Sequence, residues 1–274
     1  MLDLEGFRQY LCEEEMSKNT IKNYCATLKS YGRQFDEITK GNLIEWKQEQ
    51  LARFKPATVN ARITALLSYC KYKRIPMHLK SVKMPRRTFV DNVISREQLD
   101  TLLRGLDADG KRCWIVNIKL LAGTGMRISE AIRITKHDIM NGSVTMFTKG
   151  HMRTIYFPDA LIKGIWKDLT DLEYGDQIVR GRTRNGRDPR PITVGGFQEG
   201  LKLLAKRYGI PKEVMHPHSF RHFFAIEFLR RKNDIAMLAD LLGHSSIDMT
   251  RIYLRKTKEQ QKDAVNQAVD WLTL

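Results

Sequence analysis

Apolar side chains recur at intervals of three and four residues along most of this 274-residue chain, and this spacing restricts it to a largely helical fold. In one clear example the apolar positions are Ile21, Tyr24, Leu28, Tyr31 and Phe35. Strand patterns are expected at Ser143–Phe147 and Thr154–Phe157, which flank a Lys149-Gly150 turn and so predict a β-hairpin. We therefore expect a mainly α fold with a small antiparallel β-sheet.

The pattern of apolar residues in the first 76 residues predicts a bundle of four short helices. These helices are expected at Leu4–Glu15, at Thr20–Phe35, at Leu43–Phe54, and from Pro56 to a stop at Pro76. Each has one apolar face, so packing the four together would bury those faces in a small core.

Residues 77–93 are predicted to link this bundle to a second domain at 94–274. They lack a regular apolar period and carry four basic side chains: Lys80, Lys83, Arg86 and Arg87. A surface loop inside one single domain is the alternative. A new helix start follows, because Ser95 with Gln98 three residues later forms a capping-box pattern. Further helices are expected at Trp114–Leu121, from Ile128, and at Asp159–Leu172, Thr193–Tyr208, Pro217–Arg231, Asp234–Leu242, Ile247–Leu254 and Lys258–Leu274.

The charge balance indicates a polyanionic partner. Lys and Arg total 47 against 31 Asp and Glu, a formal net charge of +16. Such a field attracts nucleic acid or an anionic membrane. No apolar run approaches the roughly 20 residues that cross a bilayer, which favours nucleic acid; a merely soluble basic protein is the alternative. The N-terminus lacks a signal-peptide pattern and the four cysteines form no CxxC pair, so we expect a cytoplasmic protein with reduced thiols.

Two clusters of polar residues suggest anion binding. His218 and Arg221 follow Pro217 at three-residue spacing, so they share a face at the start of a helix, where a phosphate is well placed. Arg127 and Glu130 also share a face after a Gly-rich turn, so Glu130 could orient Arg127. Taken alone, the first cluster could equally be a surface pair and the second an ordinary turn with an exposed ion pair.

A third cluster runs from Gly243 and His244 to Tyr253. A glycine after a helix is most often a C-cap, and the chain has nine tyrosines, so local chemistry does not select Tyr253 as a nucleophile.

The three clusters together resemble the tyrosine recombinase (phage integrase) family. The segments that carry the resemblance are GTGMRISEA, HSFRHFFA and LLGHSSIDMTRIYL, with matching order and spacing across residues 94–260. SKNTIKNY in the N-terminal bundle is similar to the second helix of the family's core-binding, SAM-like domain. Thr148 and Phe220 depart from the residues common in the family, Gly and Leu respectively, and the first departure bears on the position of Lys149.

The resemblance implies a site-specific recombinase with a catalytic domain behind the core-binding bundle. Tyr253 would attack a phosphodiester and form a 3′-phosphotyrosine, with His218 as general base and Lys149 as general acid. Arg127, Arg221 and His244 would bind the phosphate, and Glu130 would support Arg127. The reaction would need neither a metal nor another cofactor.

The implied partner is double-stranded DNA with inverted core half-sites, on which the family assembles tetramers. Expected phosphate contacts are Arg86, Arg87, Arg153, Arg182, Arg184 and Arg187. The last helix, Lys258–Leu274, would dock into a neighbouring protomer or pack on its own domain. The resemblance leaves room for an accessory DNA-bending or directionality protein.

The expected role is integration and excision of a mobile element, with chromosome-dimer resolution or DNA inversion as alternatives. A type IB topoisomerase-like enzyme and a non-catalytic DNA-binding regulator fit the residues less well, because the bundle and all six catalytic positions are present.

Overall fold

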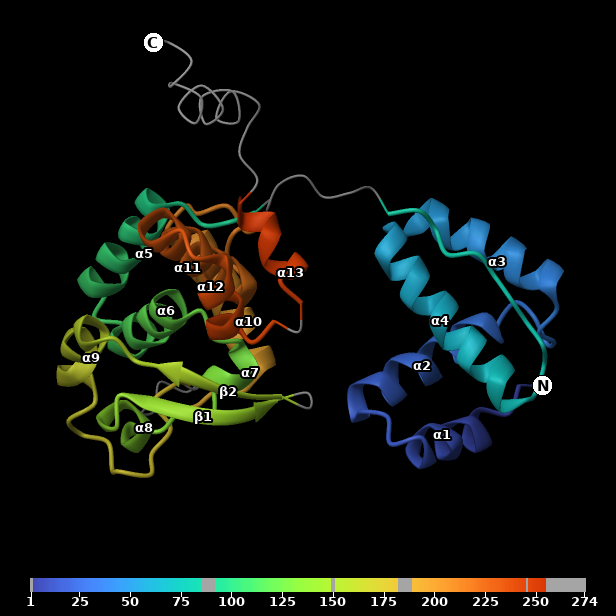
Figure 1. Ribbon diagram of the computed structural model, residues 1–274, viewed down its shortest axis with the longest axis horizontal. Coiled ribbons are helices and arrows are strands. Elements are labelled where there is room, and N and C mark those ends of the chain that lie inside the picture. Colours follow the sequence, from blue (N-terminus) through green and yellow to red (C-terminus); the bar gives the residue numbers. More distant parts are fainter. Residues whose placement is uncertain (1, 85–91, 149–150, 182–188, 245, 255–274) are drawn as a thin grey trace, which may run out of the picture. The chain divides into compact units, whose positions relative to one another are not determined.

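The computed structural model describes residues 2–84, 92–148, 151–181, 189–244 and 246–254. The chain divides into two compact units, Met1–Arg86 and Arg87–Leu274 (Figure 1). Helices make up most of both units, and the described strands form two small antiparallel pairs. The predicted mainly α fold with a small antiparallel sheet is confirmed.

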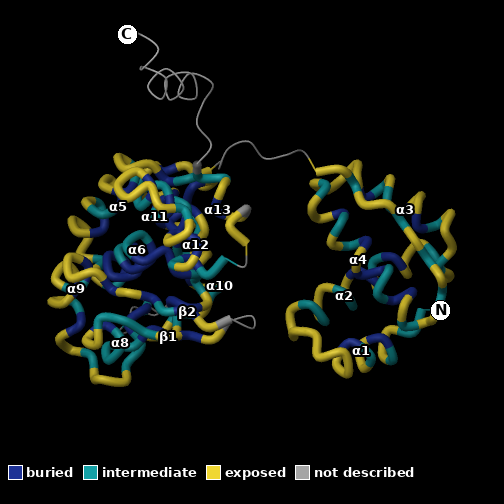
Figure 2. Tube along the Cα trace, in the orientation of Figure 1, coloured by how far each residue is buried: buried dark blue, intermediate teal, exposed yellow. Residues whose placement is uncertain are grey.

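The first unit is the expected bundle of four helices. They are α1 (Leu4–Glu13), α2 (Lys18–Tyr31), α3 (Lys40–Arg53) and α4 (Pro56–Tyr72). The side chains of Asp3, Ser17 and Thr39 cap the first three, each accepting a backbone N–H of the first turn, and Pro56 opens the fourth. Figure 2 shows the buried stretches on the inner sides of these helices. Their core consists of Phe7, Leu11, Leu28, Tyr31, Leu43, Trp46, Leu66, Tyr69 and Cys70.

The start of the predicted linker belongs to this first unit. Met77 and Leu79 pack against the core of the bundle. Asn60 on α4 then pairs with Val82 in both directions: its amide donates to the Val82 carbonyl at 3.0 Å and its oxygen accepts the Val82 N–H at 2.7 Å. The expected linker at 77–93 is therefore attached to the bundle at least as far as Val82.

The second unit begins with the predicted capping box at Ser95 and Gln98. Its elements are α5 (Arg96–Ala108), α6 (Arg112–Thr124), α7 (Ile128–Ala131), α8 (Lys136–Met140), β1 (Ser143–Thr148), β2 (His151–Tyr156), α9 (Asp159–Ile165), a 3-10 turn (Trp166–Asp168), β3 (Arg180–Gly181), β4 (Arg190–Pro191), α10 (Val194–Arg207), α11 (Pro217–Lys232), α12 (Ile235–Leu242), α13 (Asp248–Arg251) and a second 3-10 turn (Ile252–Leu254).

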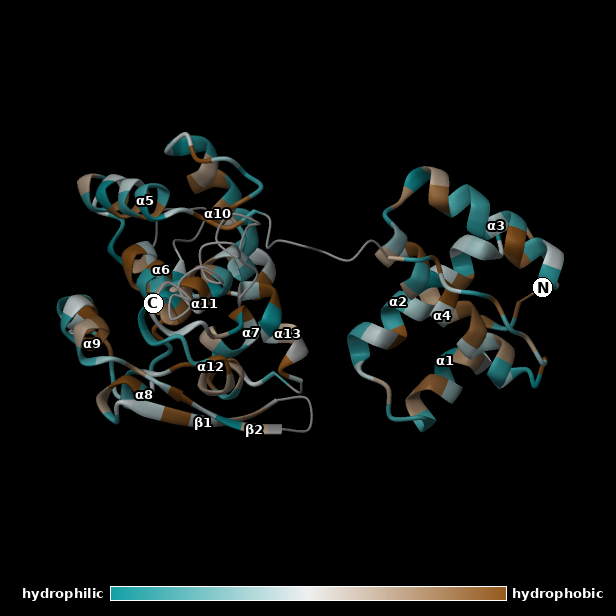
Figure 3. Cartoon of the chain, turned by 45° about the horizontal axis from the view of Figure 1, so that its top comes forward, coloured by the Kyte–Doolittle hydropathy of each residue, from teal (hydrophilic) through white to brown (hydrophobic). Residues whose placement is uncertain are grey.

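Helix α6 lies at the centre of the second unit. It packs against α5, α9 and α11, and most of its side chains are buried. Figure 3 shows the apolar character of this helix. Because α6 is covered on several sides, its apolar residues extend around more than one face. The start of the unit is tied to α11 by a buried hydrogen bond in which the Ile94 N–H donates to Ser219 Oγ at 2.8 Å.

The hairpin formed by β1 and β2 has one buried and one exposed face. Met146 pairs with Arg153 on the inner face, and Phe147 pairs with Met152 on the outer face. Strand residues alternate between the two faces of a sheet, so this register turns the Arg153 side chain toward the core.

Two predicted helices are shorter than expected. The helix predicted at Asp159–Leu172 ends at Ile165 and tightens into a 3-10 turn. Beyond this turn, the carbonyls of Thr170 and Leu172 accept hydrogen bonds from the ammonium of Lys136 at 3.4 and 2.7 Å. The helix predicted at Ile247–Leu254 is likewise a single turn, α13, followed by a 3-10 turn.

Candidate active site

Helix ends bring together the predicted catalytic residues that the structure describes. Arg127 caps α7 just after α6 has ended, while His218 and Arg221 occupy the first turns of α11. His244 follows α12, and Tyr253 lies in the 3-10 turn after α13. Lys149, the sixth predicted residue, lies outside the described residues.

Glu130 is the centre of a buried network of charges. Its side chain has no exposed surface. Oε1 accepts Arg127 Nη1 at 3.1 Å and Oε2 accepts the Arg127 backbone N–H at 2.7 Å. Oε2 also lies 3.2 Å from Arg153 Nη2. The expected contact between Glu130 and Arg127 is thus present in the structure, together with a second arginine that the sequence did not place there.

Two glycines end the helices that frame this network. Gly125 terminates α6 with φ +62°, and Gly243 terminates α12 with φ +61°, a left-handed conformation that glycine adopts without strain. The last carbonyls of both helices therefore turn toward the arginines. Arg221 donates to Gly125 O at 2.8 Å and to Leu242 O at 2.6 Å, and Arg127 donates to Gly243 O at 3.3 Å.

The network leaves an excess of positive charge at the site. Arg127, Arg153 and Arg221 face the single carboxylate of Glu130. Burial, and then the charges of Arg127 and Arg153, lower the pKa of Arg221. An anion bound here would relieve this repulsion, because it would supply the missing negative charge in a place with little water. Arg127 keeps 29% of its side-chain surface exposed and so offers a route to an incoming phosphate.

Two histidines beside the arginines are held neutral. Burial, followed by the charge of Arg221, lowers the pKa of His218. Burial and the charges of Arg221, Arg127 and Arg153 lower the pKa of His244 to about 4. A neutral imidazole can accept a proton at one nitrogen and donate a hydrogen bond from the other, which suits either predicted role at neutral pH.

His244 is held in place by Thr250, a residue that the sequence interpretation missed. His244 Nδ1 lies 2.7 Å from Thr250 Oγ1, and Thr250 is fully buried. When the hydroxyl donates to Nδ1, the remaining proton is on Nε2, which can then donate to a bound phosphate. His244 and Thr250 are six residues apart, and Thr250 lies where the sequence predicted a helix. Neither feature indicated a contact between the two side chains.

Tyr253 packs against apolar residues of α11 and α12. The buried members of this cluster are Ala225, Leu229, Leu238 and Leu242. Burial raises the pKa of Tyr253 to about 12, against a smaller lowering by the charge of Arg221. The Tyr253 hydroxyl lies 2.5 Å from Nδ1 of His222. His222 was also missed, although it stands one helical turn after His218 and so shares its face of α11.

Arg153, one of the predicted phosphate contacts, lies inside the hairpin rather than on its outer surface. Arg153 is only 7% exposed, its guanidinium lies against Glu130, and Nη1 donates to the carbonyl of Leu242. The pairing of Arg153 with Met146 on the inner face of the hairpin accounts for this burial. The other predicted phosphate contacts, Arg86, Arg87, Arg182, Arg184 and Arg187, lie outside the described residues, as does the predicted final helix at 258–274.

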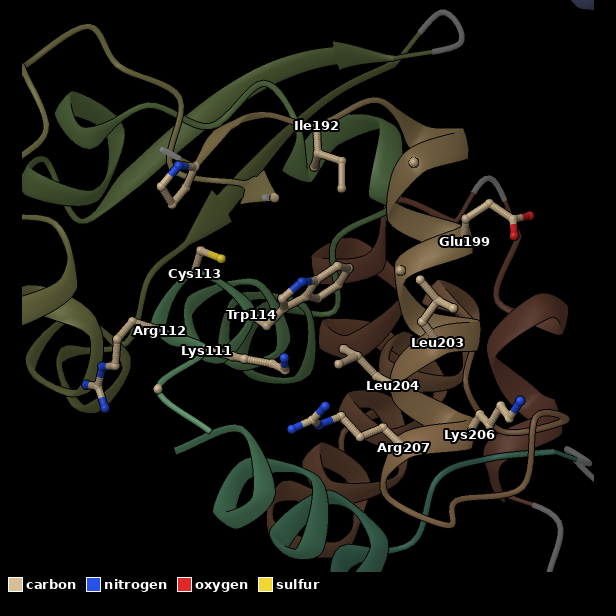
Figure 4. Close-up of a pocket in the computed structure, with 15 residues that line it drawn as sticks. Lys111, Arg112, Cys113, Trp114, Ile192, Glu199, Leu203, Leu204, Lys206 and Arg207 are labelled. Atoms are coloured by element: carbon tan, nitrogen blue, oxygen red, sulfur yellow. The ribbon is translucent and has the colours of Figure 1, made fainter. Parts of the chain in front are cut away.

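Two hollows of the second unit differ in their relation to this site. One, of about 440 Å³, lies beside it and is lined by Arg153, Gly243 and His244 among others. The other, of about 850 Å³, lies where the start of α6 faces α10, around Trp114 and Leu203 (Figure 4). None of the five predicted catalytic residues that the structure describes lines the second hollow.

The described ranges contain neither a candidate metal site nor a candidate membrane-spanning helix. No group of three or more His, Cys, Asp or Glu side chains within those ranges is arranged to hold a metal ion. No helix described there is long and apolar enough to cross a bilayer.

Comparison with known proteins identifies two family domains in this chain. Residues 92–260 match the phage integrase family, and residues 4–74 match the N-terminal SAM-like domain of phage integrases. The tyrosine recombinase XerA of Pyrococcus furiosus is 30% identical over 97% of this chain and 93% of its own length. The tyrosine recombinase XerD of Oceanobacillus iheyensis is 26% identical over 95% of each chain.

Solved structures share the fold at low sequence identity. The Tn1549 transposon integrase in complex with transposon right end DNA has a TM-score of 0.73, with 16% identity over 98% of this chain and 100% of that chain. The XerH site-specific recombinase bound to its difH substrate has a TM-score of 0.67, with 18% identity over 94% of this chain and 82% of that chain. With its SAM-like N-terminal domain and its integrase catalytic domain, this chain belongs to the phage integrase family of tyrosine recombinases.

Proposed function

We propose that this recombinase cleaves and rejoins duplex DNA at specific sites through a covalent bond between Tyr253 and a 3′ phosphate. The observation that carries the proposal is the convergence of Arg127, Arg221 and His244 at the ends of α6 and α12, with the charge of Arg221 also acting on Tyr253. The tyrosine is close enough to Arg221 for its pKa to respond to the guanidinium charge. A nucleophile beside a cationic, partly buried anion site is the arrangement that phosphoryl transfer requires.

The scissile phosphate would occupy the space in front of the arginines. Arg127 and Arg221 would each donate to a non-bridging oxygen, and His244 would donate from Nε2. Negative charge on these oxygens grows as the fifth bond to phosphorus forms, so donors that are already fixed in place favour the transition state over the ground state. Glu130 and the carbonyls of Leu242, Gly125 and Gly243 supply that fixation.

The chemical step exchanges one ester bond for another. Tyr253 Oη forms a bond to phosphorus, the bond from phosphorus to the 5′ oxygen breaks, and that oxygen takes a proton from Lys149. The DNA is then linked to the enzyme by a phosphotyrosine that keeps the energy of the original ester. Attack by a 5′ hydroxyl from another strand reverses the step and joins the two strands.

The proposed DNA partner carries inverted core half-sites, and the proposed active assembly is a tetramer. Strand exchange between two duplexes requires four cleavages and therefore four tyrosines. The segment 258–274 is proposed to dock into the next protomer of this assembly, and an accessory DNA-bending or directionality protein would act on the same complex. A relative with this fold has been crystallised as a lambda integrase dimer bound to a core site.

The proposed biological use is integration and excision of a mobile element. Integration, dimer resolution and inversion share the same cleavage and joining chemistry, and they differ in where the two target sites lie and how they are oriented. The sequences of captured target sites, placed on the host replicon, therefore discriminate among them.

A strand-joining assay tests the proposed function. Target sites are first selected from a random library of nicked duplexes by covalent capture on the protein. Two duplexes of different length that carry the selected site are then incubated with the full chain. We expect two new products whose lengths combine one arm from each duplex. Relaxation of supercoiled DNA without these products would instead indicate a topoisomerase, and DNA binding without any adduct would indicate a regulator.

A further inference from the structure

The hydroxyl of Tyr253 has one histidine nitrogen within hydrogen-bonding distance in the described part of the chain, and it belongs to His222. Resting on the proposed function, we propose that His222 rather than His218 accepts the proton of Tyr253 when this oxygen attacks DNA. The structure thus assigns a catalytic role to a residue outside the set that the sequence motifs indicate.

The two histidines stand in a row along one face of α11. His218 and His222 are one turn apart, and their ring centroids are separated by 6.3 Å. The ring of Tyr253 lies next to His222, with centroids 5.5 Å apart, and its oxygen lies 2.5 Å from Nδ1. Proton transfer needs a heavy-atom contact of about 2.6–3.2 Å or a single bridging water, so His222 meets the geometric condition directly.

His218 occupies the end of this row that faces the arginines. It stands on the first turn of α11, and the charges of Arg221 and Arg127 both act on it. A group in this position is placed to contact the phosphate that the arginines bind. The row therefore separates two tasks: His218 contacts the phosphate, and His222 contacts the nucleophile.

Tyr253 needs a base because its burial disfavours the phenolate. With a pKa of about 12, only about one molecule in 10⁵ would carry the reactive phenolate at pH 7. A base in contact with the hydroxyl removes the proton as the bond to phosphorus forms, so the free phenolate never has to accumulate.

The proton follows a balanced path. His222 accepts at Nδ1 when its own proton is on Nε2. As Tyr253 Oη bonds to phosphorus, its proton passes to Nδ1 and gives an imidazolium. The bond from phosphorus to the 5′ oxygen breaks, and this oxygen takes a proton from Lys149. In the rejoining step the imidazolium returns its proton to Tyr253 as the phenolic oxygen leaves.

Substitutions at position 222 separate proton transfer from simple holding of the tyrosine. His222→Ala removes both functions. His222→Asn places an amide oxygen near the position of Nδ1, where it can accept the hydrogen bond but not the proton. His137→Ala is the matched control. His137 lies on α8 and contacts Tyr174 and the C-cap residue Asn141, none of which belongs to the site.

The measured quantity is the single-turnover rate of adduct formation by the full chain on a nicked duplex. We expect both His222 variants to be slower by about 10²–10⁴-fold, the range typical of a general base, with DNA affinity within about threefold of wild type. The His137 variant should react at the wild-type rate. Added imidazole should restore part of the rate of His222→Ala. Fluorotyrosine at position 253, a more acidic phenol, should accelerate the Ala variant more than it accelerates the wild type.

Three results would overturn the role of His222. One is a rate for His222→Ala equal to that of wild type. Another is recovery of the full rate by His222→Asn, which would mean that His222 only holds the tyrosine. The last is rescue of His218→Ala by imidazole or fluorotyrosine with no rescue of His222→Ala. A wild-type protein that forms no adduct would overturn the proposed function itself, and this outcome is distinct from all three.

Discussion

The carboxylate of Glu130, which has no exposed surface, lies 3.2 Å from the guanidinium of Arg153 on strand β2. The same carboxylate orients Arg127, so one buried acid joins the catalytic arginine to the hairpin. Arg153 stands four residues after Lys149 on that hairpin. Glu130 therefore anchors the strand that leads from the proposed general acid into the arginine cluster.

Glu130→Gln should destabilise the second unit strongly. The amide cannot offset the charge of the arginines around it, and breaking a buried ion pair costs about 3–5 kcal/mol. Hydrogen exchange of the α6 amides in urea measures the free energy of unfolding of this unit. Glu199→Gln, whose carboxylate is 69% exposed and pairs with Lys202, should change that free energy by less than about 0.5 kcal/mol. Equal effects of the two substitutions would contradict the role of Glu130.

Arg153→Leu should slow adduct formation without weakening DNA binding. The substitution releases β2 from Glu130 and the Leu242 carbonyl, and the buried guanidinium is not available to a DNA phosphate. We expect a loss of more than about tenfold in rate and an unchanged dependence of the DNA dissociation constant on salt. A salt dependence reduced by about one phosphate contact would show that Arg153 binds DNA after all.

Gly125→Ala tests the left-handed C-terminal end of α6, and Gly110→Ala, in the turn between α5 and α6, is its matched control. Both glycines have φ +62°, but a Cβ at Gly110 would meet nothing within 4 Å, whereas one at Gly125 would overlap the ring of Phe224. The backbone conformation alone costs about 1–2 kcal/mol in each variant. Overlap with Phe224 should add about 1–3 kcal/mol at Gly125, measured as the difference between the two unfolding free energies. Equal destabilisation would contradict this packing.

The helices of both units and the hairpin were predictable because their signals are local. The spacing of apolar residues, the capping box at Ser95 and the glycines after α6 and α12 all act within a few residues of the chain. The end of α9 was not predictable in this way. The carbonyls of Thr170 and Leu172, where the helix was expected to continue, bind Lys136, which is more than 30 residues earlier in the chain.

The site shows the same division between local and distant effects. The motif residues were found because their order along the chain is distinctive. The burial of Arg153 was not predicted, because its partner Glu130 is distant in the sequence. His222 and Thr250 were missed because their partners, Tyr253 and His244, reach them only after the chain has folded.

Stability of the second unit should fall as the pH drops from about 6.5 toward about 4. His244 has a pKa of about 4 in the folded chain and about 6.5 when unfolded, so the unfolded chain binds more protons throughout this window. The contribution of His244 is fully present above pH 6.5, and we expect it to be about 1–2 kcal/mol after allowance for solvent screening. Urea midpoints at pH 7.5 and pH 5 should therefore differ more for wild type than for His244→Gln. An identical pH dependence of the two proteins would contradict the assignment.

The central claim is that Tyr253 becomes covalently bound to DNA, and the most direct measurement identifies the residue that carries the nucleotide. The full chain is incubated with a nicked target duplex, and the adduct is digested with trypsin and nuclease and analysed by mass spectrometry. We predict a nucleotide joined through its 3′ phosphate to Tyr253, no adduct with Tyr253→Phe, and a normal adduct with Tyr174→Phe, which alters an exposed tyrosine. A nucleotide on any other residue, or an adduct that persists in Tyr253→Phe, would contradict the claim.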